Sequence, residues 1–335
     1  MTAYRSFREQ SLHYFIRPHD ALPGGSIDSP AAWRGPDIAK QQDEWMVALT
    51  EDEIAELGAA HDALQKESVP LDAITRDNFV LPTLGARIAG WRDEIRNGRG
   101  FVMVRGLPVA KWGTDKAAYV YWGIGHHLGL PGAQNPQNEL LGHVVDYGEE
   151  KDNPVVRRYR TTGHIDFHCD AADAVGLLCL HTAKSGGQSR IVSSVAIFNA
   201  IQQQRPDLVA RLFEPFMLDR RDEQGEGESP FFPIPPCRHS DANGLQTFYH
   251  SEYFRSADRH GDVTIDTAAM ELLDLYDSLC LSPELQLDMW LEQGDMQFIS
   301  NHTVVHSRTA YEDWPERERK RHLLRLWLSF EDPGD

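Results

Sequence analysis

Apolar residues recur along this chain with two different periods, and each period predicts a different kind of element. From Thr50 onward, Ile54, Leu57 and Leu64 recur at helical spacing. A threonine followed by acidic residues is typical of a helix N-cap, so we expect the helix to begin there. The nearly continuous apolar run at 174–182 is instead typical of a strand that is buried on both faces.

The same patterns divide the chain into a helical first third and a mainly β remainder. Residues with β-type patterns predict further strands at 100–108, 189–194, 246–254, 296–306 and 322–330. Helical patterns cover 115–128, 195–213 and 266–280. Segments rich in turn residues predict irregular structure at 22–44 and a loop or flap at 224–247. Strands interrupted by helices, without regular βαβ alternation, favour an antiparallel β core such as a jelly roll or a barrel.

Charge and cysteine content narrow the classes of function. The net charge is −18, which disfavours binding to nucleic acid or to an anionic membrane surface. No apolar run is long enough for a membrane span, and the N-terminus has no apolar segment of the kind found in secretory signals. The 4 cysteines form no CxxC motif, so we expect buried, reduced thiols in a cytoplasmic protein.

Two overlapping His-x-Asp triplets are the first candidate for chemistry. They are His164-Ile165-Asp166 and His168-Cys169-Asp170. In an extended chain, residues i and i+2 point to the same face, so each triplet directs an imidazole and a carboxylate to one point. Such a pair supplies two ligands of the 2-His-1-carboxylate site that binds non-haem Fe(II). A third ligand must then come from a distant strand, where His302 and His306 are both candidates.

Two arginines near the C-terminus also need an explanation. Arg325 lies inside the apolar run 322–330, and Arg321 directly precedes that run. Their spacing places both side chains on one face of a strand. A buried guanidinium needs an anionic partner, which is either a bound carboxylate or one of the 51 acidic residues of the chain.

Taken together, these segments resemble the taurine dioxygenase / clavaminate synthase-like family of Fe(II)- and 2-oxoglutarate-dependent oxygenases. The resemblance rests on HCDAADAVGLLCLHTAKSGGQSRIVSS and on NHTVVHSRTAYEDWPERERKRHLLRLWLS. It covers roughly residues 85–330, and it implies a mainly β core of the double-stranded β-helix (jelly-roll) type with flanking helices. We therefore expect one structural domain overall, with an N-terminal helical extension over 1–84 packed on a jelly-roll oxygenase domain over 85–335.

The resemblance also implies roles for individual residues. His168 and Asp170 match the first two iron ligands, because they lie closer to the apolar strand than His164 and Asp166 do. His306 matches the distal ligand better than His302, because the family's His-x-Arg-Thr-Ala segment begins there. The further implied roles are binding of the distal carboxylate of 2-oxoglutarate by Arg321 and Ser189, and binding of substrate by Arg325. No catalytic residue beyond the metal centre is implied.

The implied function is that of a dioxygenase that uses Fe(II), 2-oxoglutarate and O2. It hydroxylates or otherwise oxidises an unactivated C–H bond of a small acidic, amino-acid-like or natural-product molecule, releasing succinate and CO2, in keeping with a biosynthetic role. The expected partner is a small molecule, not nucleic acid or membrane, and homo-oligomerisation is left open. Two alternatives are a non-catalytic jelly-roll binding protein with a vestigial metal site and a zinc hydrolase, although the chain has no HExxH motif.

Overall fold

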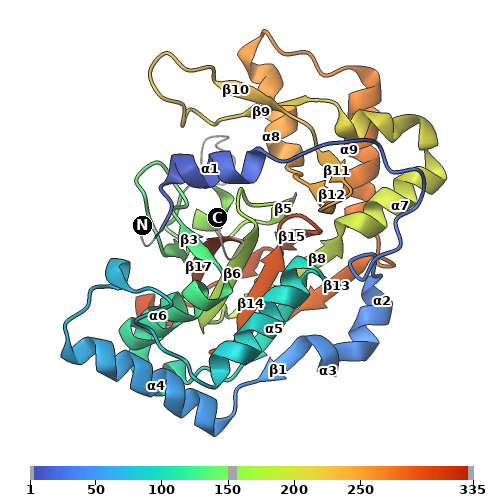
Figure 1. Ribbon diagram of the computed structural model, residues 1–335. Helices are drawn as coiled ribbons and strands as arrows, with labels where there is room; N and C mark the ends of the chain where they lie inside the picture. Colours follow the sequence, from blue (N-terminus) through green and yellow to red (C-terminus); the bar gives the residue numbers. More distant parts are fainter. Residues whose placement is uncertain (1–3, 150–156, 331–335) are drawn as a thin grey trace.

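Two β-sheets form the centre of the computed structural model, which describes residues 4–149 and 157–330 (Figure 1). The larger sheet has the order β1-β2-β14-β6-β17-β3, with β4 also paired to β17. The smaller sheet has the order β13-β8-β15-β5. Neighbouring strands are antiparallel except for the parallel pair β1–β2. The strands of the larger sheet are β1 (Met46–Ala48), β2 (Phe101–Arg105), β3 (Leu130–Gly132), β4 (Gly142–Val144), β6 (Ala174–His181), β14 (Met296–Ser300) and β17 (His322–Ser329). Those of the smaller sheet are β5 (Ile165–His168), β8 (Ser189–Ser193), β13 (Gln286–Met289) and β15 (Val304–Arg308).

The two sheets face each other across a shared apolar layer. That layer combines Phe101, Val175 and Trp327 of the larger sheet with Ile191 and Val304 of the smaller one. No strand of the described residues pairs in both sheets, so the core is a jelly roll and not a closed barrel. The predicted fold class, a mainly β double-stranded β-helix with flanking helices, is confirmed.

Alternation along β17 shows why this strand is apolar on both faces. Leu324, Leu326 and Leu328 pack against helices on the outer face of the larger sheet. The residues between them, such as Trp327, point toward the smaller sheet. The strand predicted at 174–182 is β6 and has the same two-sided burial, as expected for a strand between two layers.

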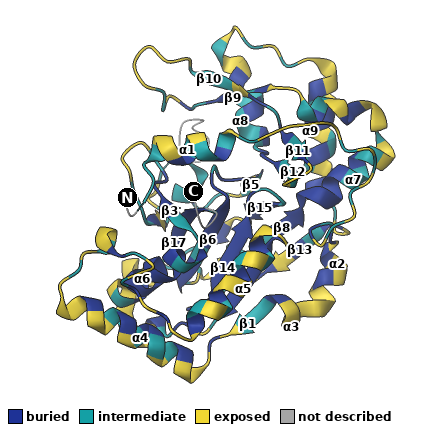
Figure 2. Ribbon diagram, viewed as in Figure 1, coloured by how far each residue is buried: buried dark blue, intermediate teal, exposed yellow. Residues whose placement is uncertain are grey.

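Helices cover the outer faces of both sheets, and the strands between them are mostly buried (Figure 2). The larger sheet is covered by α4 (Glu51–Lys66), α5 (Leu84–Arg96) and α6 (Val109–Leu128). The smaller sheet is covered by α7 (Ser194–Gln204), α8 (Ser251–Ser256) and α9 (Thr267–Cys280). The helix predicted from Thr50 is α4, and Thr50 and Glu53 form a capping box at its start.

The N-terminal region contacts both layers of the core. Strand β1 extends the larger sheet beside β2, and Trp33 and Ile38 join the apolar layer between the sheets. Its other helices are α1 (Phe7–Phe15), α2 (Gly35–Ile38) and α3 (Gln42–Trp45). The division of the chain after residue 84 stays a prediction, and its outer ends, 1–3 and 331–335, lie outside the described residues.

Several sequence-based predictions of secondary structure were wrong. Residues 22–44, predicted to be irregular, hold α2, the 3₁₀ helix Ala39–Gln41 and most of α3. The predicted loop at 224–247 contributes strands to two hairpins: β9 (Phe216–Asp219) with β10 (Phe231–Ile234), and β11 (Cys237–Ser240) with β12 (Gly244–Thr247). The turn residues between these short strands dominate the local composition and hide them. The strand predicted at 246–254 ends at Thr247 and is followed by α8, because a short aromatic run fits either period. The strand predicted at 296–306 is two strands, β14 and β15, separated by a turn at 301–303.

Shorter elements complete the fold. The predicted helix at 195–213 ends at Gln204, since Pro206 cannot continue it, and 3₁₀ turns follow. The short strand β7 (Ser185–Gly186) pairs with β16 (Tyr311–Glu312). The 3₁₀ helices are Ala39–Gln41, Leu71–Ala73, Arg158–Arg160, Pro206–Leu208, Ala210–Phe213, Ala257–His260 and Arg317–Arg319. All four cysteines are free and buried, as expected. Within the described ranges, no helix combines the length and apolarity needed to cross a bilayer.

Candidate metal centre

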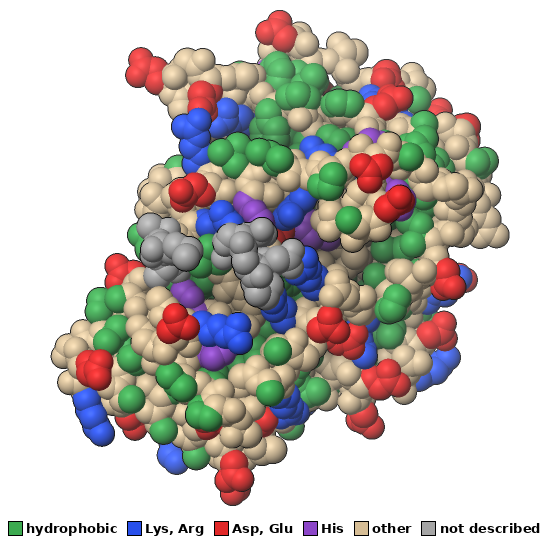
Figure 3. All heavy atoms as spheres, in the orientation of Figure 1, with side chains coloured by type: hydrophobic (Ala, Val, Ile, Leu, Met, Phe, Trp, Pro, Cys, Tyr) green, Lys and Arg blue, Asp and Glu red, His purple; other side chains and the backbone are tan. Residues whose placement is uncertain are grey.

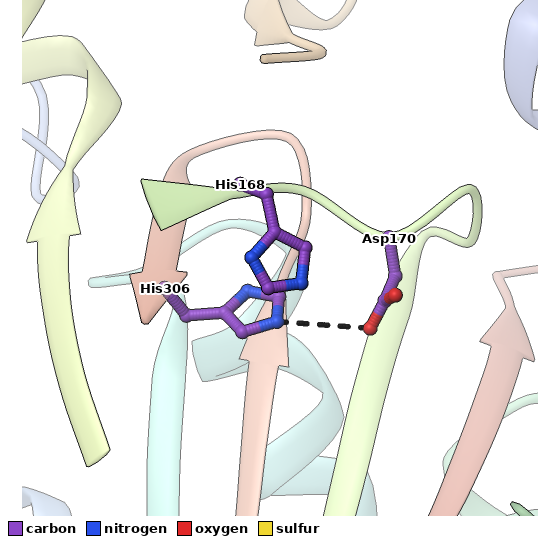
Figure 4. A group of neighbouring side chains, drawn as sticks. All are labelled: His168, Asp170 and His306. Carbon is purple, nitrogen blue, oxygen red and sulfur yellow. Dashed lines mark ion pairs between the residues drawn. The ribbon is translucent and has the colours of Figure 1, made fainter. Parts of the chain in front are cut away.

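Strand pairing in the smaller sheet brings two histidines together. His168 ends β5, and the antiparallel register places it directly opposite His306 of β15. Asp170 follows in the connection from β5 to β6. One ligand atom from each of the three side chains lies within 4.8 Å of the others, and the side chains point toward one another (Figure 4). Among the residues that the structure describes, no other group of three histidine, cysteine or acidic side chains meets this criterion.

The polar atoms of this cluster fit a metal ion. The Oδ2 atom of Asp170 is buried, accepts no hydrogen bond and lies 3.7 Å from Nε2 of His306. A buried carboxylate oxygen without a donor is costly unless a cation satisfies it. The Nδ1–H of His168 donates to the carbonyl oxygen of Asp166 at 2.8 Å, which leaves Nε2 of His168 as a free electron-pair donor. The set is thus two imidazoles and one carboxylate, the donor set of non-haem Fe(II) sites.

Burial and local charges hold these groups in the forms that bind metals. Burial, together with the nearby His168, lowers the pKa of His306 to about 3, so its imidazole is neutral. Burial alone would raise the pKa of Asp170, but its neighbours, with the charge of Arg325 first among them, outweigh that effect and lower it. A neutral imidazole and an ionised carboxylate result near pH 7.

The alternative candidates lie outside this cluster. His164 and Asp166 form an ion pair with each other at 3.2 Å, and their side chains are 41% and 69% exposed. His302 pairs with Asp173 at 2.8 Å and stacks on the ring of Tyr14. The structure therefore brings together His168, Asp170 and His306 and leaves the other candidates apart.

A cavity with about 970 Å³ of empty volume, its open mouth included, adjoins the cluster. It is lined from both sheets, and Ser189, Arg321 and Arg325 all lie in its wall with the three clustered residues. Strand alternation explains this, because Ser189 shares a face of β8 with Ile191, and His306 shares a face of β15 with Val304. In the space-filling view, histidine and basic side chains gather near the middle of the face shown, while acidic side chains are spread around it (Figure 3).

The guanidinium groups of two buried arginines at this cavity form no ion pair with a carboxylate of the described part of the chain. Arg321 is 7% exposed, and its Nη1 atom has no hydrogen-bond partner. Arg308 donates from Nη2 to the carbonyl oxygens of Thr161 (2.8 Å) and Gly163, but its Nε and Nη1 atoms have no partner. Both guanidinium groups lie against the ring of Tyr311. Burial lowers the pKa of both, and the charge of Arg321 lowers that of Arg308 further. Two such cations are suited to an anionic ligand.

Sequence reasoning assigned no role to Arg308. The signal was present in the triplet His306-Ser307-Arg308, because strand alternation directs Arg308 to the same face as His306. The other two cavity residues from the sequence have partners in the protein. The hydroxyl of Ser189 donates to Oε1 of Gln297 at 3.0 Å. Arg325 contacts Oδ1 of Asp170 at 3.3 Å from Nη1 and donates from Nε to Gln134 at 2.7 Å.

The wall of the cavity opposite the buried arginines is held by stacked rings and by ion pairs within the protein. His250 forms an isolated bridge with His168, and the ring of Tyr253 stacks on it with centroids 3.5 Å apart. Arg158 pairs with Glu252 at 3.0 Å, and Arg157 pairs with Glu223 at 2.6 Å. Of these wall residues, His250, Glu252 and Tyr253 lie in the segment at 246–254 that the sequence predicted as a strand. No sequence pattern pointed to Arg157, Arg158 or Glu223.

Comparison with known proteins agrees with this geometry. The family model described as taurine catabolism dioxygenase TauD, TfdA family, matches residues 65–327. The FR-33289 synthase of Streptomyces rubellomurinus is 28% identical over 301 residues, which cover 86% of each chain. The taurine hydroxylase-like protein SAT17 of Stachybotrys chartarum is 25% identical over 310 residues, covering 90% of this chain and 79% of the relative.

A solved structure shares the fold at low identity. It is an asparagine oxygenase in complex with Fe(II), 2S,3S-3-hydroxyasparagine and succinate, with a TM-score of 0.66 at 18% identity, covering 85% of this chain and 93% of that one. The family match spans most of the chain and includes every clustered residue. The chain therefore belongs to the TauD/TfdA family and is a non-haem iron dioxygenase that depends on Fe(II), 2-oxoglutarate and O2.

Proposed function

We propose that His168, Asp170 and His306 hold the iron ion of this enzyme. The observation that carries this proposal is the convergence of their three ligand atoms within 4.8 Å, with a buried oxygen of Asp170 that has no other partner. Two imidazoles and one carboxylate leave part of the coordination sphere of a bound ion open to the cavity. His168 is oriented for this role by its hydrogen bond to the Asp166 carbonyl.

We propose that Arg321 and Ser189 bind the distal carboxylate of 2-oxoglutarate, with Arg308 beside them. A planar guanidinium binds a carboxylate through two parallel hydrogen bonds, and Arg321 has a buried N–H group available for this. Bound together, iron, 2-oxoglutarate and O2 supply the oxidising power for C–H hydroxylation, with release of succinate and CO2. The residues of the chain hold these groups in place and exclude water, since Asp170, His306 and Arg321 are all buried.

The proposed substrate is a small acidic, amino-acid-like or natural-product molecule that enters beside Arg325. The asparagine oxygenase with the same fold is described with a hydroxylated amino acid, and one relative is named as a synthase, in keeping with a biosynthetic role. Arg325 is 8% exposed and lies against the rings of Tyr159 and Trp327, so it can place a positive charge at the substrate without solvent around it.

We also propose a cytoplasmic enzyme, with residues 85–335 as its oxygenase domain and 1–84 as an extension packed on it. Four buried free thiols fit a reducing compartment. A net charge of −18 favours a small-molecule partner over nucleic acid or an anionic membrane.

The test is anaerobic addition of Fe(II) and 2-oxoglutarate to the metal-free protein, followed by visible absorption. Chelation of iron by the keto acid gives a charge-transfer band, which we expect in the wild-type protein. His168→Ala and Arg321→Ala should lose or weaken the band, while His164→Ala, from the neighbouring triplet, should keep it. A folded wild-type protein that binds Fe(II) without this band would favour a vestigial binding site or a zinc hydrolase.

A further inference from the structure

The segment that carries Asp170 is held from outside by one buried asparagine. This segment, residues 169–173, connects β5 to β6 and is called the ligand loop below. Asn301, in the turn after β14, is completely buried. Its side-chain Oδ1 accepts the backbone N–H of Asp170 at 2.9 Å, and its own N–H donates to the carbonyl oxygen of Asp173 at 2.9 Å. Asn301 thus contacts the ligand loop at Asp170 and again at its far end.

The N-terminal segment supports the same arrangement from its other side. The hydroxyl of Tyr14 donates to the carbonyl oxygen of Asn301 at 3.1 Å. Gln10 donates to the carbonyl oxygen of Ala171 at 3.4 Å. His13 and Arg17 of this segment pair with the carboxylate of Asp173, His13 at 2.9 Å. His302, next to Asn301, pairs with the same carboxylate at 2.8 Å. Residues 10–17 therefore contact the ligand loop and the asparagine that binds it.

These contacts have a consequence for Asp170, because its carboxylate has little support of its own. Its hydrogen bond to Arg325 is long, at 3.3 Å, and Oδ2 has no partner. The direction of the side chain is therefore set largely by the backbone of residue 170, whose N–H is fixed by Asn301. Small displacements of a ligand weaken metal binding, and partners that orient ligands commonly change metal affinity by about 10- to 100-fold.

We propose that Asn301, braced by residues 10–17, is a positioning residue that sets the metal affinity of the site through the backbone of Asp170. The inference rests on the proposed role of Asp170 as an iron ligand. It also gives the first helix of the chain a part in the metal centre, although no residue of that helix lines the cavity.

The experiment is a titration of the metal-free, full-length protein with Co(II), followed by visible absorption and calorimetry. We expect Asn301→Ala to weaken Co(II) binding by about tenfold or more. Tyr14→Phe, which removes only one hydroxyl, should weaken binding by a few-fold. The matched control is Asn199→Ala, because Asn199 also bonds the backbone through its side chain, to N–H and C=O of Ile27, but does not line the cavity. It should lower the melting temperature and leave the Co(II) affinity unchanged.

Each outcome separates the inference from the proposed function. If wild-type protein fails to bind Co(II), or if Asp170→Ala binds it equally well, the proposed metal site itself is wrong. If Asp170→Ala loses binding while a folded Asn301→Ala binds like wild type, only the positioning role is wrong. Should Asn301→Ala not fold, Tyr14→Phe decides, and unchanged affinity in that variant overturns the role of the brace.

Discussion

The cavity contains two sets of arginines that differ in their partners. Arg308, in β15, and Arg321, directly before β17, have buried side-chain N–H groups without partners, and their guanidinium groups form no ion pair with a carboxylate of the described residues. Arg157 and Arg158, in the opposite wall, are paired to Glu223 and Glu252. An unpaired buried cation is stable only with an anionic ligand, whereas a paired one is already neutralised. The comparison favours the first set as the site of the anion in the proposed function, whereas the second set is already satisfied by the protein and shapes the cavity wall.

The elements that carry the two sets differ as well. The metal cluster and Arg308 lie on or beside paired strands, where register fixes each side chain. The opposite wall comes from a 3₁₀ turn, α8 and the segment before it, and ion pairs hold these pieces together. Rigid strands suit groups that must keep fixed geometry, while loops and short helices vary more readily among relatives.

The largest effect should follow removal of Arg321. Loss of a bidentate charge-assisted contact costs about 3 kcal/mol, so Arg321→Ala should weaken 2-oxoglutarate binding by about 100-fold. The measurement is a titration of the charge-transfer band at saturating Fe(II). A change below about threefold would remove Arg321 from the proposed carboxylate site.

A smaller effect is expected at Arg308, which already uses Nη2 for two carbonyl oxygens. Arg308→Met removes the second charge and should weaken 2-oxoglutarate binding by about tenfold, equivalent to about 1.4 kcal/mol. Co(II) affinity of the same variant is the control and should not change. Equal losses of both affinities would mean that Arg308 acts only by holding residues 161–163.

We expect acid to destabilise α8 and the residues after it before it destabilises β15. Helix α8 forms the cavity wall with Arg157 and Arg158. Burial alone would raise the pKa of Asp219, but its bonds to Arg259, His260, the N–H of Arg221 and Ser256 lower it below the usual range. A lowered carboxyl pKa gives stability that is present at neutral pH and is lost as pH falls from about 5. Amide hydrogen exchange, corrected for the intrinsic pH effect, should show 251–260 losing protection progressively as the pH falls from 4 toward 2, while 304–308 keeps it. Asp219→Asn should already show low protection of 251–260 at pH 7; unchanged protection there would contradict this prediction.

The smallest effect is expected at Glu252, which pairs with Arg158 and Arg221. Glu252→Gln should cost about 1 kcal/mol of unfolding free energy, because these groups are partly exposed. Binding of 2-oxoglutarate, measured by the same band, should stay within about twofold of wild type. A large loss of cosubstrate affinity would show that the two sets of arginines are not separate.

How far the sequence predicted the molecule depends on the range of the interactions involved. His168, Asp170 and Arg321 could be selected because each stands next to an apolar strand in a short pattern. The hairpins around 231–247 and helix α8 could not, because such short elements depend on contacts with distant segments, as α8 does with β5, β9 and α9. The pair Arg158–Glu252 joins two distant segments, and no local pattern reveals it. The brace of Tyr14 on Asn301 was hidden for the same reason.

The direct register of His168 with His306 has a further consequence for folding. An ion bound by both would cross-link two strands that are far apart in the sequence, closing a long loop of chain. If the ion stays bound in the unfolded chain, the closed loop lowers the conformational entropy of that chain. If the ion binds only the folded state, the free energy of unfolding rises with the logarithm of the metal concentration. Metal supply would thus act on how long the enzyme survives in the cell as well as on its activity.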